Sequence, residues 1–155
     1  FVTAFMGILN TRTGVMRYVN AGHNPPLVRK DNGLYEWLPV KQEFVLAGLP
    51  NVRYTEQEIT FGPRDTLFLY TDGVTEAMNR VEQLYSPKRL IRVLNQFPVS
   101  LGLERTIVGI KEDVDHFAEG TEQADDITML MLRYDQNEEI SHKENPGNPA
   151  KEDFI

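Results

Sequence analysis

The chain has 155 residues, about the length of one domain, and its 41% hydrophobic and 25% charged residues are typical of a globular protein. The formal net charge is −7 and basic clusters are absent, so we expect no nucleic-acid-binding face. The absence of cysteine excludes disulfides, thiolate metal sites and a cysteine nucleophile. No apolar run is long enough to span a bilayer, so we expect a cytoplasmic domain without membrane contact, whether or not the parent protein is membrane-tethered.

The first half of the chain is rich in predicted strands joined by turns. The opening run, residues 1–9, is mostly apolar and indicates a strand buried on both faces. Residues 10–14 form a predicted turn that leads into a returning strand, and the Asn32-Gly33 pair predicts a second hairpin. The strands expected in this half are residues 1–9, 15–21, 27–29, 34–38, 53–61 and 66–70.

The second half predicts helices followed by one last strand. Residues 74–78 are expected to form one or two helical turns, and Ser86-Pro87 has the pattern of an N-cap followed by proline at the first helical position. Apolar spacing predicts helices over residues 87–97 and 103–117. Residues 127–134 are apolar on both faces and predict a central strand. Residues 135–155 hold six acids and two bases, and their polarity predicts a flexible tail.

Hairpin-joined strands followed by amphipathic helices predict an α+β fold with antiparallel sheets. Phe1 is not an initiator methionine, and the chain opens inside a predicted core strand. We therefore expect a fragment from which an upstream part is missing. Removal of strands exposes sheet edges, which pair with other chains, so a homodimer is also expected.

Two segments each join an apolar strand to a carboxylate. Residues 67–70 lead into Asp72-Gly73, with Glu76 close behind, and Asp125-Asp126 lead out into the last predicted strand. Taken singly, each segment is more typical of an ordinary turn. A carboxylate at the tip of a buried strand is nevertheless costly unless it is hydrogen-bonded or binds a cation. If the two tips converge, their oxygens suit Mg²⁺ or Mn²⁺, and the sequence does not choose between these ions.

Together with residues 1–9 and the run Tyr18-Val-Asn-Ala-Gly-His23-Asn-Pro-Pro26, these segments resemble the SpoIIE/RsbU branch of the metal-dependent protein serine/threonine phosphatases. The resemblance covers residues 1–134, with the segments in the same order and spacing. It implies an antiparallel β-sandwich flanked by helices on both outer faces, in the order α-β-β-α. It also implies a binuclear Mn²⁺ or Mg²⁺ centre at one end of the sandwich, in a bacterial signalling protein.

The resemblance assigns roles residue by residue. It implies that Asp72 and Asp125 are metal ligands, that Gly73 belongs to the metal site, and that a metal-activated water replaces any catalytic side chain. Glu76, Asp126 and His23 are candidates for a secondary metal or for contacts behind the ligands, although a simple loop histidine is slightly favoured for His23. His116 is expected to be exposed on a helix, and His142 to lie in the tail.

One departure from the family pattern gives a second hypothesis. The family has an early aspartate segment that bridges both metals, and no residue of this chain replaces it. The resemblance implies hydrolysis of phosphoserine or phosphothreonine on an anti-anti-sigma-type regulatory protein. The missing aspartate leaves the alternative of a non-catalytic, pseudophosphatase-like binding module, and implies weak or no activity for this chain in isolation.

Overall fold

The computed structural model describes residues 1–31, 33–41 and 43–135. None of the helices in these ranges is both long and apolar enough to cross a membrane. The strands are β1 (Ala4–Leu9), β2 (Val15–Ala21), β3 (Leu27–Arg29), β4 (Tyr35–Trp37), β5 (Gln57–Thr60), β6 (Thr66–Tyr70) and β7 (Met129–Arg133). The helices are α1 (Asp72–Thr75), α2 (Pro87–Leu94) and α3 (Leu103–Phe117).

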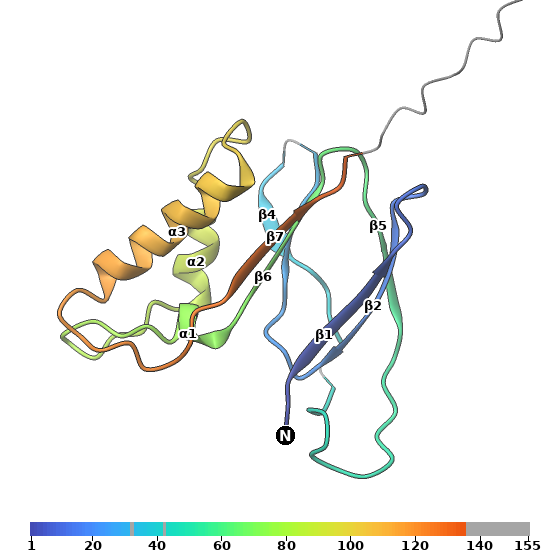
Figure 1. Cartoon of the computed structure of the whole chain (residues 1–155), viewed down its shortest axis with the longest axis horizontal. Helices are drawn as coiled ribbons and strands as arrows, with labels where there is room; N and C mark the ends of the chain where they lie inside the picture. Colours follow the sequence, from blue (N-terminus) through green and yellow to red (C-terminus); the bar gives the residue numbers. More distant parts are fainter. Residues whose placement is uncertain (32, 42, 136–155) are drawn as a thin grey trace, which may run out of the picture.

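The strands form two antiparallel sheets that pack as a sandwich (Figure 1). One sheet has the order β1-β2-β5 and the other has the order β4-β3-β6-β7. Helices α2 and α3 lie on the outer side of the four-stranded sheet, opposite the three-stranded sheet (Figure 1). The predicted α+β class and antiparallel sandwich are therefore confirmed. Within the described ranges, helices cover one of the two outer faces.

Alternation along β6 divides the interior into two cores, because successive side chains of a strand point to opposite faces. Phe68 and Tyr70 belong to the core beneath the helices, whereas Leu67 belongs to the core between the sheets. Leu27 and Val28 of β3 divide in the same way. This sheet therefore has apolar side chains on both faces, which explains the uninterrupted apolar run that leads to Asp72.

The helices follow the sequence signals closely. The Ser86 side chain accepts a hydrogen bond from the Arg89 N–H at 3.4 Å, and Pro87 is the first helical residue of α2. In α3, Ile110 and Val114 are fully buried against the sheet. The Asp113 carboxylate accepts from the Tyr85 hydroxyl at 2.7 Å and pairs with Arg89 at 3.1 Å, which ties α3 to the start of α2.

Several details of the sequence prediction differ from the structure. The strand expected over residues 53–61 is reduced to β5, and the helix expected over residues 87–97 ends at Leu94. The opening strand is not buried on both faces, because Met6 and Ile8 are 64% and 58% exposed on the outer face of a sheet edge. Strand β7 is not central but lies at the edge of its described sheet, with Leu130 half-exposed. The helical turn begins at Asp72 rather than at residue 74. The predicted tail lies outside the described residues after Asp135, as does His142.

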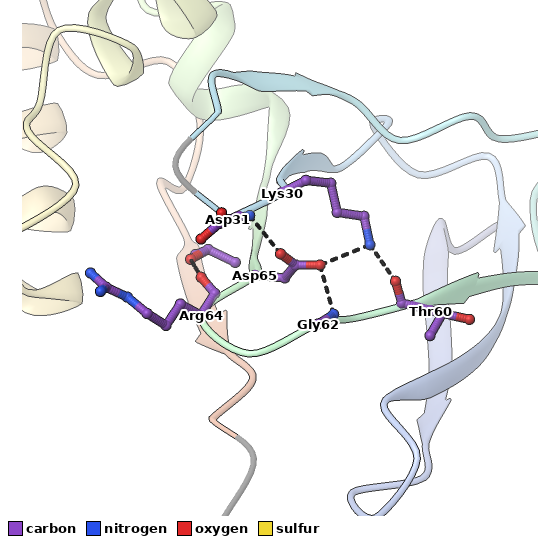
Figure 2. Close-up of polar contacts among 7 residues, drawn as sticks. Lys30, Asp31, Thr60, Gly62, Arg64 and Asp65 are labelled. Carbon is purple, nitrogen blue, oxygen red and sulfur yellow. Dashed lines mark hydrogen bonds and ion pairs between the residues drawn. The ribbon is translucent and has the colours of Figure 1, made fainter.

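Asp65 fastens the turn before β6 to the hairpin between β3 and β4 (Figure 2). Its carboxylate accepts from the Asp31 N–H at 2.6 Å and the Gly62 N–H at 2.8 Å, and pairs with the Lys30 ammonium at 2.9 Å. Lys30 also donates to the Thr60 carbonyl. Burial by itself would raise the pKa of Asp65, but these donors hold that pKa below its ordinary value.

Candidate functional site

The C-terminal end of β6 and the N-terminal end of β7 meet at one end of the four-stranded sheet. Tyr70 pairs with Met129, and beyond this pair the Thr71 N–H donates to the Thr128 carbonyl at 3.0 Å. The Thr71 hydroxyl donates to the Asp126 carbonyl at 2.8 Å and accepts from the Thr128 N–H at 2.9 Å. Antiparallel pairing thus brings together the two segments that the sequence singled out.

Gly73 makes the closest approach between these segments. A Cβ atom at this position would lie 2.5 Å from the Asp126 carbonyl oxygen and 3.0 Å from the Asp125 carbonyl oxygen. Both neighbours are main-chain atoms, which cannot swing aside as a flexible side chain can. Glycine is therefore required here by space, because the main chain of α1 lies directly against the main chain of residues 125–126.

The acidic side chains at this end are exposed and have few partners. Asp72, Asp125 and Asp126 are all exposed. Asp125 Oδ1 accepts from the Asp126 N–H at 2.7 Å, and the Gln123 side chain binds the Asp125 carbonyl. Within the described ranges, the Asp72 carboxylate takes part in no hydrogen bond or ion pair. Its oxygens and one oxygen of Asp125 are thus available to a cation.

Glu76 and His23 lie at the same end of the molecule. Glu76 is exposed at the C-terminal end of α1 and borders a pocket together with Gly73 and Asp125. His23 is half-buried in the loop between β2 and β3. Burial lowers the pKa of His23, and the charge of nearby Asp72 acts in the opposite direction. His116 is exposed on α3, as predicted.

Two residues that hold this end together were not foreseen from the sequence. The Thr71 hydroxyl hydrogen-bonds to the main chain of Asp126 and of Thr128, and so joins the end of β6 to the segment before β7. Asn20 is buried, and its side chain accepts from the His23 N–H at 2.7 Å and donates to the His23 carbonyl at 2.9 Å. The sequence offered two weak signals for these roles. Thr71 is a hydroxyl residue at the end of a predicted strand, and Asn20 is an amide residue three positions before His23.

The donor set fits part of a metal shell. Carboxylate oxygens are the ligands that Mg²⁺ and Mn²⁺ prefer. Among residues 1–31, 33–41 and 43–135, however, no group of three or more histidine or acidic side chains is close enough to hold a metal ion. The two predicted ligands, Asp72 and Asp125, would therefore supply only part of a near-octahedral shell.

The sequence and fold of the chain are similar to those of known proteins. The sequence model described as Stage II sporulation protein E (SpoIIE) matches residues 1–135. The chain belongs to the SpoIIE family. Protein IcfG of Synechocystis sp. is 30% identical over 133 residues, which make up 85% of this chain and 20% of IcfG. The chain thus spans about a fifth of the length of IcfG.

Solved structures share the SpoIIE-type fold. The SiaA-PP2C domain of Pseudomonas aeruginosa has a TM-score of 0.72 at 19% identity, over 86% of this chain and 52% of that one. The Mn-presoaked phosphatase domain of SpoIIE from Bacillus subtilis has a TM-score of 0.65 at 16% identity, over 87% and 57%. The chain spans just over half of each solved domain. Its fold is that of a PP2C-like phosphatase domain of the SpoIIE type.

Proposed function

We propose that the protein containing this chain is a metal-dependent serine/threonine phosphatase, and that its substrate is a phosphoserine or phosphothreonine on an anti-anti-sigma-type regulatory protein. Family membership supports the class of reaction. The observation that carries the proposal is the contact of Gly73 with the main chain of residues 125–126, which joins the two acidic segments at one end of the sheet.

In this proposal Asp72 and Asp125 hold the metal through their exposed carboxylates. The chemistry that a bound Mn²⁺ or Mg²⁺ centre supplies is an activated water and neutralisation of phosphoryl charge. The chain's own residues fix the geometry: Thr71 and Gly73 set the spacing between the two acidic segments, and Asn20 fixes the loop that carries His23. Two carboxylates do not complete a near-octahedral shell, so water molecules or ligands beyond this pair would supply the remaining positions.

The experiment is a phosphatase assay on the full-length protein with phosphoserine and phosphothreonine peptides, in Mn²⁺ and in EDTA. We expect hydrolysis in Mn²⁺ and its loss in EDTA, because the metal supplies the nucleophile. Equal rates in the two buffers would contradict the metal assignment. Binding of a phosphoprotein without any turnover would instead support the pseudophosphatase-like binding module.

A further inference from the structure

A pocket of about 310 Å³ opens directly beside the candidate metal ligands. Its walls are α1 and the residues that follow it, the last turn of α3, and the segment that returns from α3 to β7. Figure 1 shows this returning segment passing close to α1. Gly73 and Asp125 line the pocket, so it is continuous with the metal end.

The pocket walls are tied to each other. The Thr121 hydroxyl lies 2.5 Å from the Met78 carbonyl and 2.6 Å from the Ala118 carbonyl, which links the α3 end to the segment after α1. The Arg80 Nε donates to the Glu119 carbonyl at 3.0 Å across the same two segments. Gly120 turns the chain with a φ of 83°, a conformation that favours glycine. The pocket is therefore preformed by bonds between its walls.

The pocket lining combines apolar residues with carboxylates. Its apolar members include Val114, Ala118 and Ile127, and none of its members is Lys, Arg or His. Its acidic members are Glu76, Asp115, Glu119, Glu122 and Asp125. Lys111 pairs with Asp115 at 2.5 Å, whereas Glu76, Glu119 and Glu122 form no ion pair with any residue that the structure describes. Arg80 lines a neighbouring hollow beside His116.

This combination matches the side chain of arginine or lysine. Such a side chain lays its methylene groups along apolar surface and keeps its charged end at polar groups. A divalent metal fits less well, because the described residues contain no group of three or more acidic or histidine side chains able to hold one. We propose that the pocket binds a basic side chain of the substrate that lies close in sequence to the phosphorylated residue, because Asp125 belongs both to the pocket lining and to the candidate metal end.

The inference rests on the proposed phosphatase function and names a feature of its substrate. The test measures binding, so that it does not depend on turnover. Fluorescein-labelled phosphoserine peptides carry arginine at one position from −3 to +3, and each is compared with its citrulline counterpart, which has the same shape without the charge. Binding to the full-length protein is followed by fluorescence anisotropy in EDTA at low and high salt.

At one or more positions we expect the arginine peptide to bind at least about fivefold more tightly than its citrulline counterpart, with the difference shrinking at high salt. In the double variant Glu119→Gln, Glu122→Gln this ratio should fall towards one. The control Glu104→Gln, Glu112→Gln removes the same charge from exposed positions of α3 outside the pocket lining and should keep the ratio.

Equal binding of arginine and citrulline peptides at every position would overturn the inference, as would an absence of measurable binding. An equal loss of the ratio in the control variant would show a general charge effect and would overturn it too. Hydrolysis of p-nitrophenyl phosphate in Mn²⁺ is measured separately. Failure of that reaction counts against the phosphatase function and leaves the arginine-to-citrulline ratio as an independent result.

Discussion

Gly73 is the single residue on which the geometry of the candidate site depends most. Its missing side chain lets α1 lie against the carbonyl groups of Asp125 and Asp126, and a Cβ there would come within 2.5 Å of main-chain oxygen. The Asp-Gly pair itself was visible in the sequence. The partner of the glycine was not, because it lies more than 50 residues away and meets Gly73 only through the β6–β7 pairing.

We predict that Gly73→Ala destabilises the protein by about 1 to 3 kcal/mol, the usual range for overpacking against atoms that cannot move aside. It should also push residues 125–126 away from Asp72 and weaken Mn²⁺ binding. Urea denaturation and metal titration measure the two effects. The control is Gly102→Ala, where an added Cβ meets nothing within 4 Å. Equal effects of the two substitutions would refute the close-approach argument.

Thr71 and Asn20 show what local sequence cannot reveal. Each is an ordinary polar residue whose partners become neighbours only in the folded chain. Thr71 hydrogen-bonds across the β6–β7 junction, and the buried Asn20 side chain hydrogen-bonds to the main chain of His23. Asp72 and Asp125 could be identified because their flanking residues carry a family pattern. Their roles as metal ligands stay a prediction.

At the scale of elements, those defined by local pattern were predicted well. The helix expected over residues 103–117 is α3, and the Ser86-Pro87 start of α2 is confirmed, because capping and 3.6-residue spacing are local properties. The exposure of β1 and the edge position of β7 were mispredicted. An apolar run shows only which side chains one strand carries. Whether those side chains are buried depends on the neighbouring strands and helices that cover the strand.

Asp65 connects two turns at the end of the sandwich opposite the metal end, and it predicts a pH-dependent loss of stability. Its carboxyl has a lowered pKa in the folded state, so its contribution is present above the unfolded pKa of about 3.9 and is lost as the pH falls through the folded value. Asp65→Asn should cost about 1 to 3 kcal/mol at pH 7, because the buried carboxylate is a charged acceptor for three part-buried hydrogen bonds.

Urea denaturation of wild type and Asp65→Asn at pH 7 and pH 3 checks this expectation. The difference between the two proteins should narrow at pH 3, because this pH lies below the unfolded pKa of about 3.9 and protonation of the carboxyl in the unfolded wild-type chain lowers the stability that the charge contributes. Asp115→Asn is the control, since it breaks an exposed ion pair with Lys111 that should contribute about 0.5 kcal/mol or less. A difference that stays constant between the two pH values would contradict the assigned role of the Asp65 charge.

At the scale of the whole molecule, the three-stranded sheet presents apolar residues to solvent. Met6 and Ile8 are exposed on β1, which lies at the edge of that sheet. Exposed apolar edges associate with other chains, so we predict concentration-dependent self-association of this chain. The double substitution Met6→Lys, Ile8→Lys should reduce it, and Val108→Lys, at an exposed position of α3, should not. Sedimentation equilibrium measures the mass, and a monomer at every concentration would count against this prediction.

We propose that the C-terminal end of β6 and the N-terminal end of β7 bring Asp72 and Asp125 together as ligands of one metal centre. The most direct test is calorimetric titration of the full-length protein with Mn²⁺, using wild type, Asp72→Asn, Asp125→Asn and the control Asp31→Asn, an exposed acid in the β3–β4 hairpin. We expect at least about tenfold weaker Mn²⁺ binding for Asp72→Asn and for Asp125→Asn, and wild-type binding for the control. Unchanged Mn²⁺ affinity in either Asp72→Asn or Asp125→Asn would contradict the proposal.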